Sequence, residues 1–139
     1  MYDPVVTLQR ISKTYSRAGT DVSVLRDLSF TILAGTFLAI MGPSGSGKST
    51  LLNVMAGIDR PTSGSVVVAG TRLDDLSEGD MARWRARHIG YVFQSYNLIP
   101  VLTASENVEL PLLLTHLSRQ ERREHVKTAL RLVGLGERM

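Results

Sequence analysis

A glycine-rich segment at residues 42–50, GPSGSGKST, constrains the fold of this chain more than any other feature. It matches the pattern G-x-x-x-x-G-K followed by Ser or Thr at every fixed position. The nearly all-apolar run Thr36–Met41 comes directly before it, and apolar residues from Leu51 to Ile58 recur at the spacing of one helix face. The sequence therefore predicts a buried strand, a glycine-rich loop and a helix in that order, which is the context of a phosphate-binding loop.

The residue types of this loop suit phosphate groups. Its glycines let the backbone approach phosphate oxygens and present N–H groups to them, because no Cβ obstructs the approach. The positive end of the following helix adds to the attraction, and Lys48 supplies a mobile charge that can reach the β- and γ-phosphates. Ser49 offers a hydroxyl oxygen to Mg²⁺, and Thr50 assists at the phosphate. The alternative, a glycine-rich turn with a solvated lysine, is disfavoured by the flanking strand and helix.

Length and composition predict one globular domain that stays in the cytosol. The chain has 139 residues, of which 43% are hydrophobic and 21% are charged, enough to form an apolar core. No uncharged apolar stretch approaches the roughly 18 residues of a membrane-spanning helix, and the start, Met1-Tyr2-Asp3-Pro4, lacks the layout of a signal peptide. The sequence contains no cysteine, which excludes disulfides and thiolate metal sites.

The charges give no case for nucleic acid as the main partner. The chain carries 16 basic and 13 acidic residues, so its net charge of +3 is small and diffuse. Arg83, Arg85 and Arg87 alternate with Trp84 and follow Met81, which is typical of a solvated helix with one buried side rather than of a basic patch. The histidines share no metal-ligand spacing, so no metal site is predicted from them.

Further strands are predicted on both sides of the loop. Val5–Gln9 and Val24–Leu33 are typical of strands, and Ser16–Asp21 between them is typical of a loop. The β-branched run Val66–Val68 predicts another strand, and Ile89–Phe93 predicts a buried one.

Capping signals predict helices in the rest of the chain. A Ser or Thr followed three residues later by Asp or Glu marks a helix start. Such pairs are Ser77 with Asp80 and Thr103 with Glu106. The first helix is predicted to extend through Arg87, and Pro111 would kink or interrupt the second. A charge-dense helix with an apolar stripe is predicted from about Ser118.

Several separated segments agree in order with one family. These segments are Gly42–Thr50, Asp59–Gly64 (DRPTSG), His88–Gln94 (HIGYVFQ), Asn97–Pro100 (NLIP), Thr103–Val108 (TASENV) and Leu110–Leu112 (LPL). From Val5 to about Arg138, the chain resembles an ABC ATPase, the ATP-binding subunit of an ABC transporter. It is similar to the lipoprotein-releasing and macrolide-export branch of that family.

The resemblance implies an incomplete α/β fold. It consists of a P-loop NTPase core of the ABC ATPase type with an N-terminal antiparallel β subdomain, followed by the start of a helical subdomain at about residues 95–100. Residues 1–139 would form the N-terminal portion of one nucleotide-binding domain, because the family's Asp-Glu segment, Leu-Ser-Gly-Gly-Gln signature and switch histidine do not occur. The rest of the domain would supply strands that flank Thr36–Met41, so these 139 residues alone are expected to be marginally stable.

The resemblance also assigns roles to single residues. Tyr15 lies 27 positions before Gly42 and matches the aromatic residue that stacks on adenine, the alternative being a tyrosine packed in the core. Gln94 matches a glutamine that ligates Mg²⁺ or a water and relays nucleotide state to the membrane subunits, the alternative being a solvated strand end. The residues expected to bind the nucleotide are Tyr15, Gly42, Pro43, Ser44, Gly45, Ser46, Gly47, Lys48, Ser49 and Thr50. Ser49 and Gln94 are the expected Mg²⁺ ligands, and Lys48 and Gln94 contribute to a catalytic set that is incomplete in this sequence.

The implied function is coupling of ATP binding and hydrolysis to transport across the membrane or extraction from it. The cofactors would be ATP and Mg²⁺, and the partners a transmembrane permease subunit and a second nucleotide-binding domain, on the inner face of the cell membrane. Without an Asp-Glu segment, the 139 residues are expected to bind ATP-Mg²⁺ but not to hydrolyse it. A non-hydrolysing nucleotide-binding or interaction module is the alternative. A phosphate-loop kinase is disfavoured, because nothing after Gln94 resembles an arginine-bearing lid.

Overall fold

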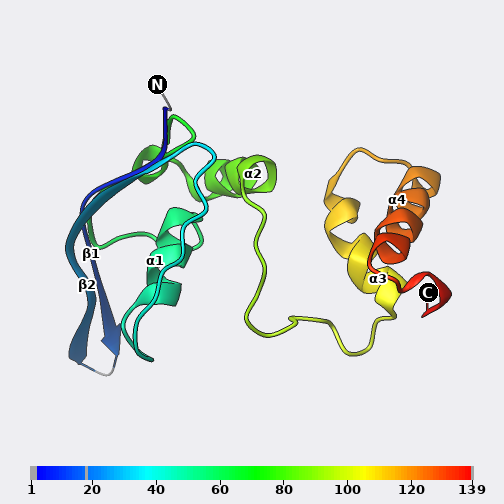
Figure 1. The fold of residues 1–139 in the computed structure, drawn as a ribbon, viewed down its shortest axis with the longest axis horizontal. Coiled ribbons are helices and arrows are strands. Elements are labelled where there is room, and N and C mark those ends of the chain that lie inside the picture. The colour runs from blue at the N-terminus through cyan, green and yellow to red at the C-terminus, as the bar shows by residue number, and fades with distance from the viewer. Residues whose placement is uncertain (1–2, 18, 139) are drawn as a thin grey trace. The chain divides into compact units, whose positions relative to one another are not determined.

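The computed structural model describes residues 3–17 and 19–138 and divides the chain into two compact units, Met1–Tyr91 and Val92–Met139 (Figure 1). Met1, Tyr2, Ala18 and Met139 lie outside the description. The first unit contains β1 (Pro4–Arg17), β2 (Thr20–Leu33), α1 (Lys48–Met55), β3 (Ser63–Val68), β4 (Thr71–Arg72), the 3₁₀ turn η1 (Leu73–Asp75) and α2 (Glu78–His88). The second contains α3 (Ala104–Glu109), the 3₁₀ segment η2 (Leu110–Leu114), α4 (Arg119–Leu132) and the 3₁₀ turn η3 (Gly136–Arg138).

The strands of the described residues form one antiparallel sheet in the order β2-β1-β3-β4. Strand β1 pairs on both sides, and Leu8 marks the register because it lies opposite Phe30 of β2 and Val66 of β3. The predicted loop Ser16–Asp21 is largely strand, apart from the turn at Gly19 and from Ala18, which is outside the description. Pairing between β1 and β2 continues as far as the turn of this hairpin. The preferences of single residues did not predict strand structure there, because it depends on the partner strand.

The core joins the sheet to α1 and α2. Its largest fully buried side chains are Leu8 and Ile11 of β1, Val54 of α1 and Val66 of β3. Met81 and Trp84 of α2 belong to the same cluster, which confirms the buried side predicted for this helix. Helix α1 buries Leu51 and Val54 of its predicted apolar stripe, but the helix ends at Met55, and Ile58, the last residue of that stripe, lies beyond it and is 48% exposed.

The second unit is helical: α3 begins at the predicted capping pair, and α4 begins after Ser118, where a helix start but no capping pair was predicted. In each capping box the Ser or Thr hydroxyl accepts from the N3 backbone N–H, and the Glu side chain accepts from the N-cap backbone N–H. The pairs are Thr103 with Glu106 and Ser118 with Glu121. Helix α3 ends at Glu109, two residues before Pro111, which confirms the predicted interruption. Within the part of the chain that the structure describes, no helix has the length and apolar content needed to span a bilayer.

Two of the predicted strands are wrong. Thr36–Met41 and Ile89–Phe93 are irregular, and neither belongs to a strand of the described residues. Phe37, Met41 and Val92 expose 97%, 89% and 95% of their surface. A strand needs a neighbour to satisfy its backbone N–H and C=O groups, and the sheet ends at β2 and β4 instead of continuing to these segments.

The irregular segment after β2 leaves an apolar groove of about 690 Å³ beside the sheet. Its walls include Leu28, Phe30 and Ile32 of β2 together with Leu38 and Ile40. Apolar surface that stays in water contributes nothing to the hydrophobic free energy of folding. The groove and the exposed apolar side chains therefore support the expectation of marginal stability, which remains a prediction.

A matched pair of glycine substitutions tests how closely β1 and β3 pack. Gly64 has a φ of +93°, and a Cβ there would lie 2.4 Å from the carbonyl oxygen of Arg10. Gly70 has a similar φ of +75° but no atom within 4 Å of such a Cβ. We expect Gly70→Ala to lower the free energy of unfolding by about 1–2 kcal/mol through backbone strain alone. Gly64→Ala should lower it by at least about 2 kcal/mol more, because β1 must also move. Urea-unfolding curves measure both losses, and equal losses would contradict the close approach at Gly64.

Candidate functional site

The glycine-rich loop connects the irregular segment to α1, and its shape depends on glycines. Gly45 and Gly47 have φ values of +79° and +87°, which disfavour other residues. A Cβ on Gly47 would also lie 3.1 Å from two side chains of β2, so this glycine lets the helix begin close to the sheet. A Cβ on Gly42 would lie 2.8 Å from the Ser46 Oγ. Glycine is therefore strongly favoured at Gly47 by its backbone angle and its neighbours, whereas at Gly42 a Cβ would need only the Ser46 hydroxyl to rotate away.

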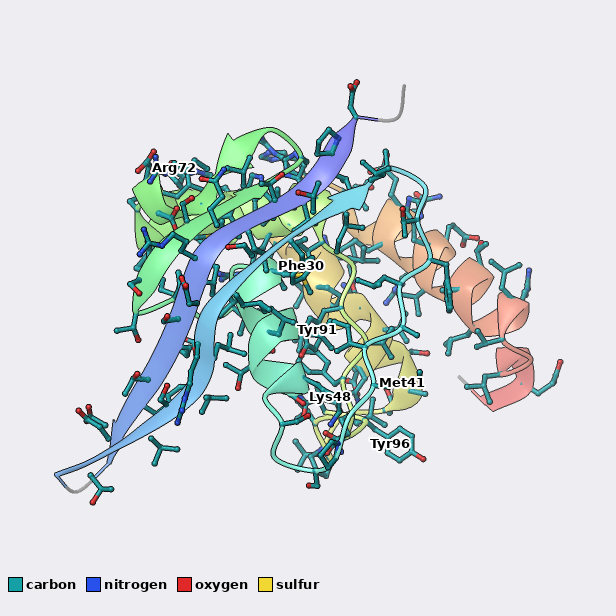
Figure 2. The ribbon with its side chains drawn as sticks, turned by 60° about the vertical axis from the view of Figure 1, so that its left-hand side comes forward. Phe30, Met41, Lys48, Arg72, Tyr91 and Tyr96 are labelled. Carbon is teal, nitrogen blue, oxygen red and sulfur yellow. The ribbon has the colours of Figure 1, made fainter. Side chains whose placement is uncertain are left out.

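The Lys48 side chain turns back onto the loop from the first residue of α1 (Figure 2). Its Nζ donates to the carbonyl oxygens of Gly42 at 2.9 Å and Pro43 at 2.7 Å, and to the Ser46 Oγ at 3.3 Å. These acceptors hold a positive charge against the loop backbone. A charge in this position suits an anionic ligand such as a phosphate group.

The N-terminus of α1 differs from those of the other α-helices that the structure describes. The N-cap residue of α1 is Gly47, which makes no side-chain hydrogen bond to the helix. The N-caps of α2, α3 and α4 are Ser77, Thr103 and Ser118, and each accepts a hydrogen bond from a backbone N–H of its helix. The first N–H groups of α1 therefore have no side-chain cap, and they are donors of the kind that bind phosphate oxygens.

The other predicted residues of the loop lie at or near the surface. Pro43, Ser44 and Ser49 are exposed, and Thr50 is half-buried. No group of three or more His, Asp or Glu side chains within residues 3–17 and 19–138 is arranged to hold a metal ion. An exposed hydroxyl such as that of Ser49 suits Mg²⁺, which keeps most of its ligands as water and phosphate oxygens.

Tyr15 lies near the end of β1 and is 39% exposed, so it is not the core tyrosine of the alternative interpretation. Its hydroxyl donates to the Asp59 Oδ2 at 2.6 Å. This hydrogen bond raises the pKa of Tyr15, and burial raises it further. The hydrogen bond to Asp59 links Tyr15 to the connection that follows α1.

Asp59 and Lys13 complete a cluster around Tyr15 that the sequence analysis missed. The Lys13 Nζ lies 2.6 Å from the Asp59 Oδ1 and 4.7 Å from the centroid of the Tyr15 ring. Burial would raise the pKa of Asp59, but the hydrogen bonds from Lys13 and Tyr15 and the charge of Lys13 outweigh it and hold this pKa below its usual range. Lys13 could have been found from its sequence position, because residues two apart on a strand share a face.

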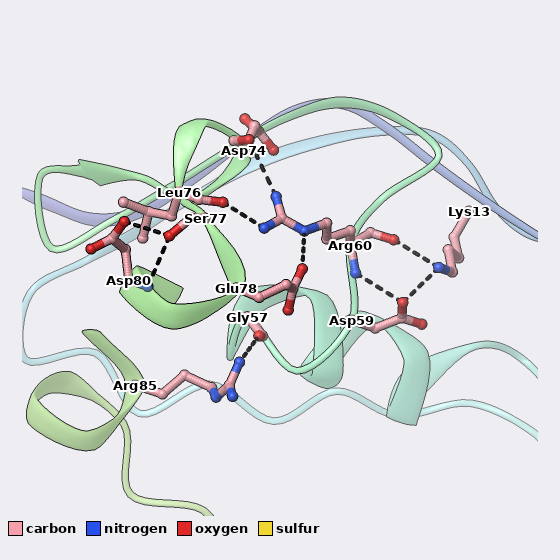
Figure 3. A network of polar contacts seen from close by, with 10 residues as sticks. All are labelled: Lys13, Gly57, Asp59, Arg60, Asp74, Leu76, Ser77, Glu78, Asp80 and Arg85. Carbon is pink, nitrogen blue, oxygen red and sulfur yellow. Dashed lines mark hydrogen bonds and ion pairs between the residues drawn. The ribbon is translucent and has the colours of Figure 1, made fainter. Parts of the chain in front are cut away.

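Arg60 fixes the segment that carries Asp59 (Figure 3). Its guanidinium donates to Glu78 Oε1 at 3.0 Å and to the carbonyl oxygens of Asp74 at 3.3 Å and Leu76 at 2.5 Å. The connection after α1 is thereby attached to the residues that lead into α2. Asp59 is therefore carried by a segment that Arg60 anchors, and not by a free loop.

Gln94, the other predicted Mg²⁺ ligand, belongs to the second unit. It lies on a bend, is exposed, and follows the irregular segment that replaces the predicted strand Ile89–Phe93. The phosphate loop and Tyr15 thus both belong to the first unit, and Gln94 is described separately with the second.

The loop, the helix and the antiparallel sheet define a phosphate-loop cassette of the ABC ATPase type. The chain superimposes on the ATP-binding cassette MJ0796, whose structure is a dimer in a post-hydrolysis state bound to ADP and Pi, with a TM-score of 0.83 and 41% identity. The match covers 93% of this chain and 57% of that chain. A sequence model of the family described as ABC transporter matches residues 25–139. The chain therefore belongs to the ABC transporter family, as part of an ATP-binding domain.

Curated relatives confirm the resemblance found in the sequence. The chain is 45% identical to an uncharacterized ABC transporter ATP-binding protein of Thermotoga maritima, and the match covers 97% of this chain and 58% of the relative. It is 44% identical to the ABC transporter ATP-binding protein YvrO of Bacillus subtilis, over 97% of this chain and 59% of the relative. It is 42% identical to the macrolide export ATP-binding/permease protein MacB 1 of Yersinia pestis, over 97% of this chain and 21% of the relative. The chain thus spans less than two thirds of each relative.

The lowered pKa of Asp59 makes a prediction about pH. A carboxyl group whose pKa is lower in the folded state stabilises the fold above its unfolded pKa of about 3.9 and loses that contribution as the pH falls through the folded value. We therefore expect Asp59→Asn to be less stable than the original chain at neutral pH, and the difference to shrink below about pH 4.

Urea unfolding at a series of pH values measures this difference. Asp27→Asn is the matched control, because the Asp27 carboxylate forms an exposed ion pair with Arg10, with side chains 73% and 84% exposed. A loss in Asp59→Asn that stays constant from neutral to acid pH would contradict the proposed charge interaction.

Proposed function

We propose that this chain binds ATP with Mg²⁺ as part of the ATP-binding subunit of a membrane transporter. The backbone of residues 42–47, the first N–H groups of α1 and the Lys48 ammonium bind the phosphates. Ser49 ligates Mg²⁺ with Thr50 beside it, and Tyr15 stacks on the adenine ring. Gln94 is the second Mg²⁺ ligand and the residue that relays nucleotide state to the membrane subunits.

The observation that carries this proposal is the combination of an uncapped helix start with a cation held over the loop. Gly47 leaves the first N–H groups of α1 without a side-chain cap, and Lys48 lies against the carbonyl oxygens of Gly42 and Pro43. Both features favour an anion at the same place. Tyr15 supports a nucleotide as the source of that anion, because it is an exposed aromatic side chain whose hydroxyl is bonded to Asp59, and Asp59 is itself bonded to Asn53 of α1.

The wider assembly is proposed from the relatives. MJ0796 was solved as a dimer, which supports a homodimer of nucleotide-binding domains in the intact protein. MacB 1 is named an ATP-binding/permease protein, which supports a transmembrane permease partner. A place on the cytoplasmic face of the membrane is proposed together with that partner. The helical unit after Tyr91 is proposed to be the start of the helical subdomain. The intact protein is proposed to couple ATP hydrolysis to transport.

Substitution of Lys48 tests the proposed phosphate site. We expect Lys48→Ala to weaken ATP-Mg²⁺ binding about tenfold or more, because a charge-assisted hydrogen bond to phosphate is lost. Isothermal titration calorimetry measures the affinity. Lys127→Ala is the control, since Lys127 lies on α4 and pairs with Glu124 at 2.8 Å. Equal affinities of the original chain and Lys48→Ala would contradict the proposal.

The chain is further proposed to bind ATP without hydrolysing it. The sequence contains no Asp-Glu pair, and the carboxylates Asp74 and Asp75 lie in or at the end of η1 near Arg72 instead of ending an apolar strand. We expect no phosphate release above that of the Lys48→Ala sample under conditions that saturate the ATP site. A colorimetric phosphate assay on the calorimetry samples measures it, and release that requires Lys48 would contradict this part of the proposal.

A further inference from the structure

Asp59 connects Tyr15 to a lysine through its two carboxylate oxygens. Oδ2 accepts from the Tyr15 hydroxyl at 2.6 Å, and Oδ1 accepts from the Lys13 Nζ at 2.6 Å and from the Arg60 backbone N–H at 2.8 Å. The Lys13 Nζ also donates to the Arg60 carbonyl oxygen at 2.7 Å. The phenol is thus held at its hydroxyl by a carboxylate that is itself held by two further donors.

Lys13 restricts the ring of Tyr15 in a second way. Its ammonium lies 4.7 Å from the ring centroid, which is the range of a cation–π contact. This contact covers one face of the ring, so a planar ligand stacks only on the other. The Lys13 side chain is 12% exposed and that of Asp59 is 27% exposed, which makes this pair far less solvated than the Arg10–Asp27 pair of the same sheet.

The cluster and the phosphate loop share one rigid element. The loop lies before α1, whereas Asp59 follows α1 and is attached to it by a hydrogen bond from its backbone N–H to the Asn53 carbonyl oxygen at 3.2 Å. Arg60 then ties the same connection to the residues before α2 (Figure 3). Any change in the position of α1 therefore moves both the loop and the group that orients Tyr15.

We propose that Asp59 and Lys13 are positioning residues that hold the Tyr15 ring ready for a base, Asp59 at the hydroxyl and Lys13 on one face. The inference rests on the proposed function, in which Tyr15 stacks on adenine. Ordering a free side chain on binding opposes affinity, and a ring that is already ordered avoids this loss, which corresponds to roughly two- to tenfold in the dissociation constant. Neither residue touches the nucleotide in this proposal.

The test compares a ligand that has a base with one that lacks it. Calorimetry measures the binding of ATP-Mg²⁺ and of tripolyphosphate-Mg²⁺ to the original chain, Asp59→Ala, Lys13→Met and the control Asp27→Ala. We expect Asp59→Ala and Lys13→Met to weaken ATP binding about two- to tenfold and to leave tripolyphosphate binding unchanged. Asp27→Ala should change neither affinity, and circular dichroism verifies that each variant is folded.

A second background separates positioning from a general structural effect. In Tyr15→Ala, the further change Asp59→Ala should leave the ATP affinity where it is, because no ring remains to be oriented. Equal weakening of ATP and tripolyphosphate, or a loss of ATP affinity that persists in Tyr15→Ala, would overturn the proposal. If Lys48→Ala weakens ATP binding but Tyr15→Ala does not, the phosphate site stands and the base platform, with its positioning residues, is rejected.

A measurement without nucleotide tests the cluster itself. Ionisation of Tyr15, identified by comparison with Tyr15→Phe, is followed by ultraviolet absorbance as the pH is raised. We expect Tyr15 to ionise at lower pH in Asp59→Ala than in the original chain, because the carboxylate that stabilises the neutral phenol is gone. An unchanged titration would overturn the proposal. A shifted titration would also overturn it if the original chain bound ATP-Mg²⁺ no more tightly than tripolyphosphate-Mg²⁺, because the base would then add nothing to the affinity.

Discussion

Strand β1 hydrogen-bonds on both of its sides, and the rest of the first unit depends on this double pairing. Its neighbours β2 and β3 are far apart in sequence, and Leu8 faces Phe30 of one and Val66 of the other. At Arg10, which has a φ of +51°, the register shifts, and Gly64 allows β3 to pass close to the irregularity. The sheet can therefore curve around its core without leaving space between these strands.

Beyond this irregularity, the side chains of β1 change from residues of the core to residues of the candidate site. Ile11 is fully buried, whereas Lys13 and Tyr15, two and four residues later on the same face, meet the connection that follows α1. Helix α1 starts at the phosphate loop and packs its Val54 into the same core. One strand and one helix thus set the relative position of the aromatic ring and the loop.

Local signals predicted the local structure well. The caps at Ser77 and Thr103, the helix start near Ser118, the first part of the α1 stripe and the glycine-rich loop each depend on residues a few positions apart. The family and the fold class followed because several such segments occur in one order.

Features that depend on distant residues were not predicted. Thr36–Met41 has the composition of a buried strand but no neighbouring strand in the described sheet, so its composition did not decide its structure. Asp59 lies 46 positions from Lys13, and only the folded sheet brings them together. The segment that contains Asp59 was informative for the family, yet its motif gave no reason to connect it with Tyr15. The roles of the loop residues, Tyr15 and Gln94 remain predictions.

The way Lys48 is held bears on how strongly a phosphate can bind. Its ammonium already has three uncharged acceptors in the loop, which satisfy its hydrogen bonds and leave its positive charge in place. A phosphate would have to replace some of these acceptors, and the lysine would contribute the difference between two sets of hydrogen bonds instead of a full new interaction. Such an exchange favours reversible binding over very tight binding, because the Lys48 ammonium regains its three loop acceptors whenever the ligand leaves.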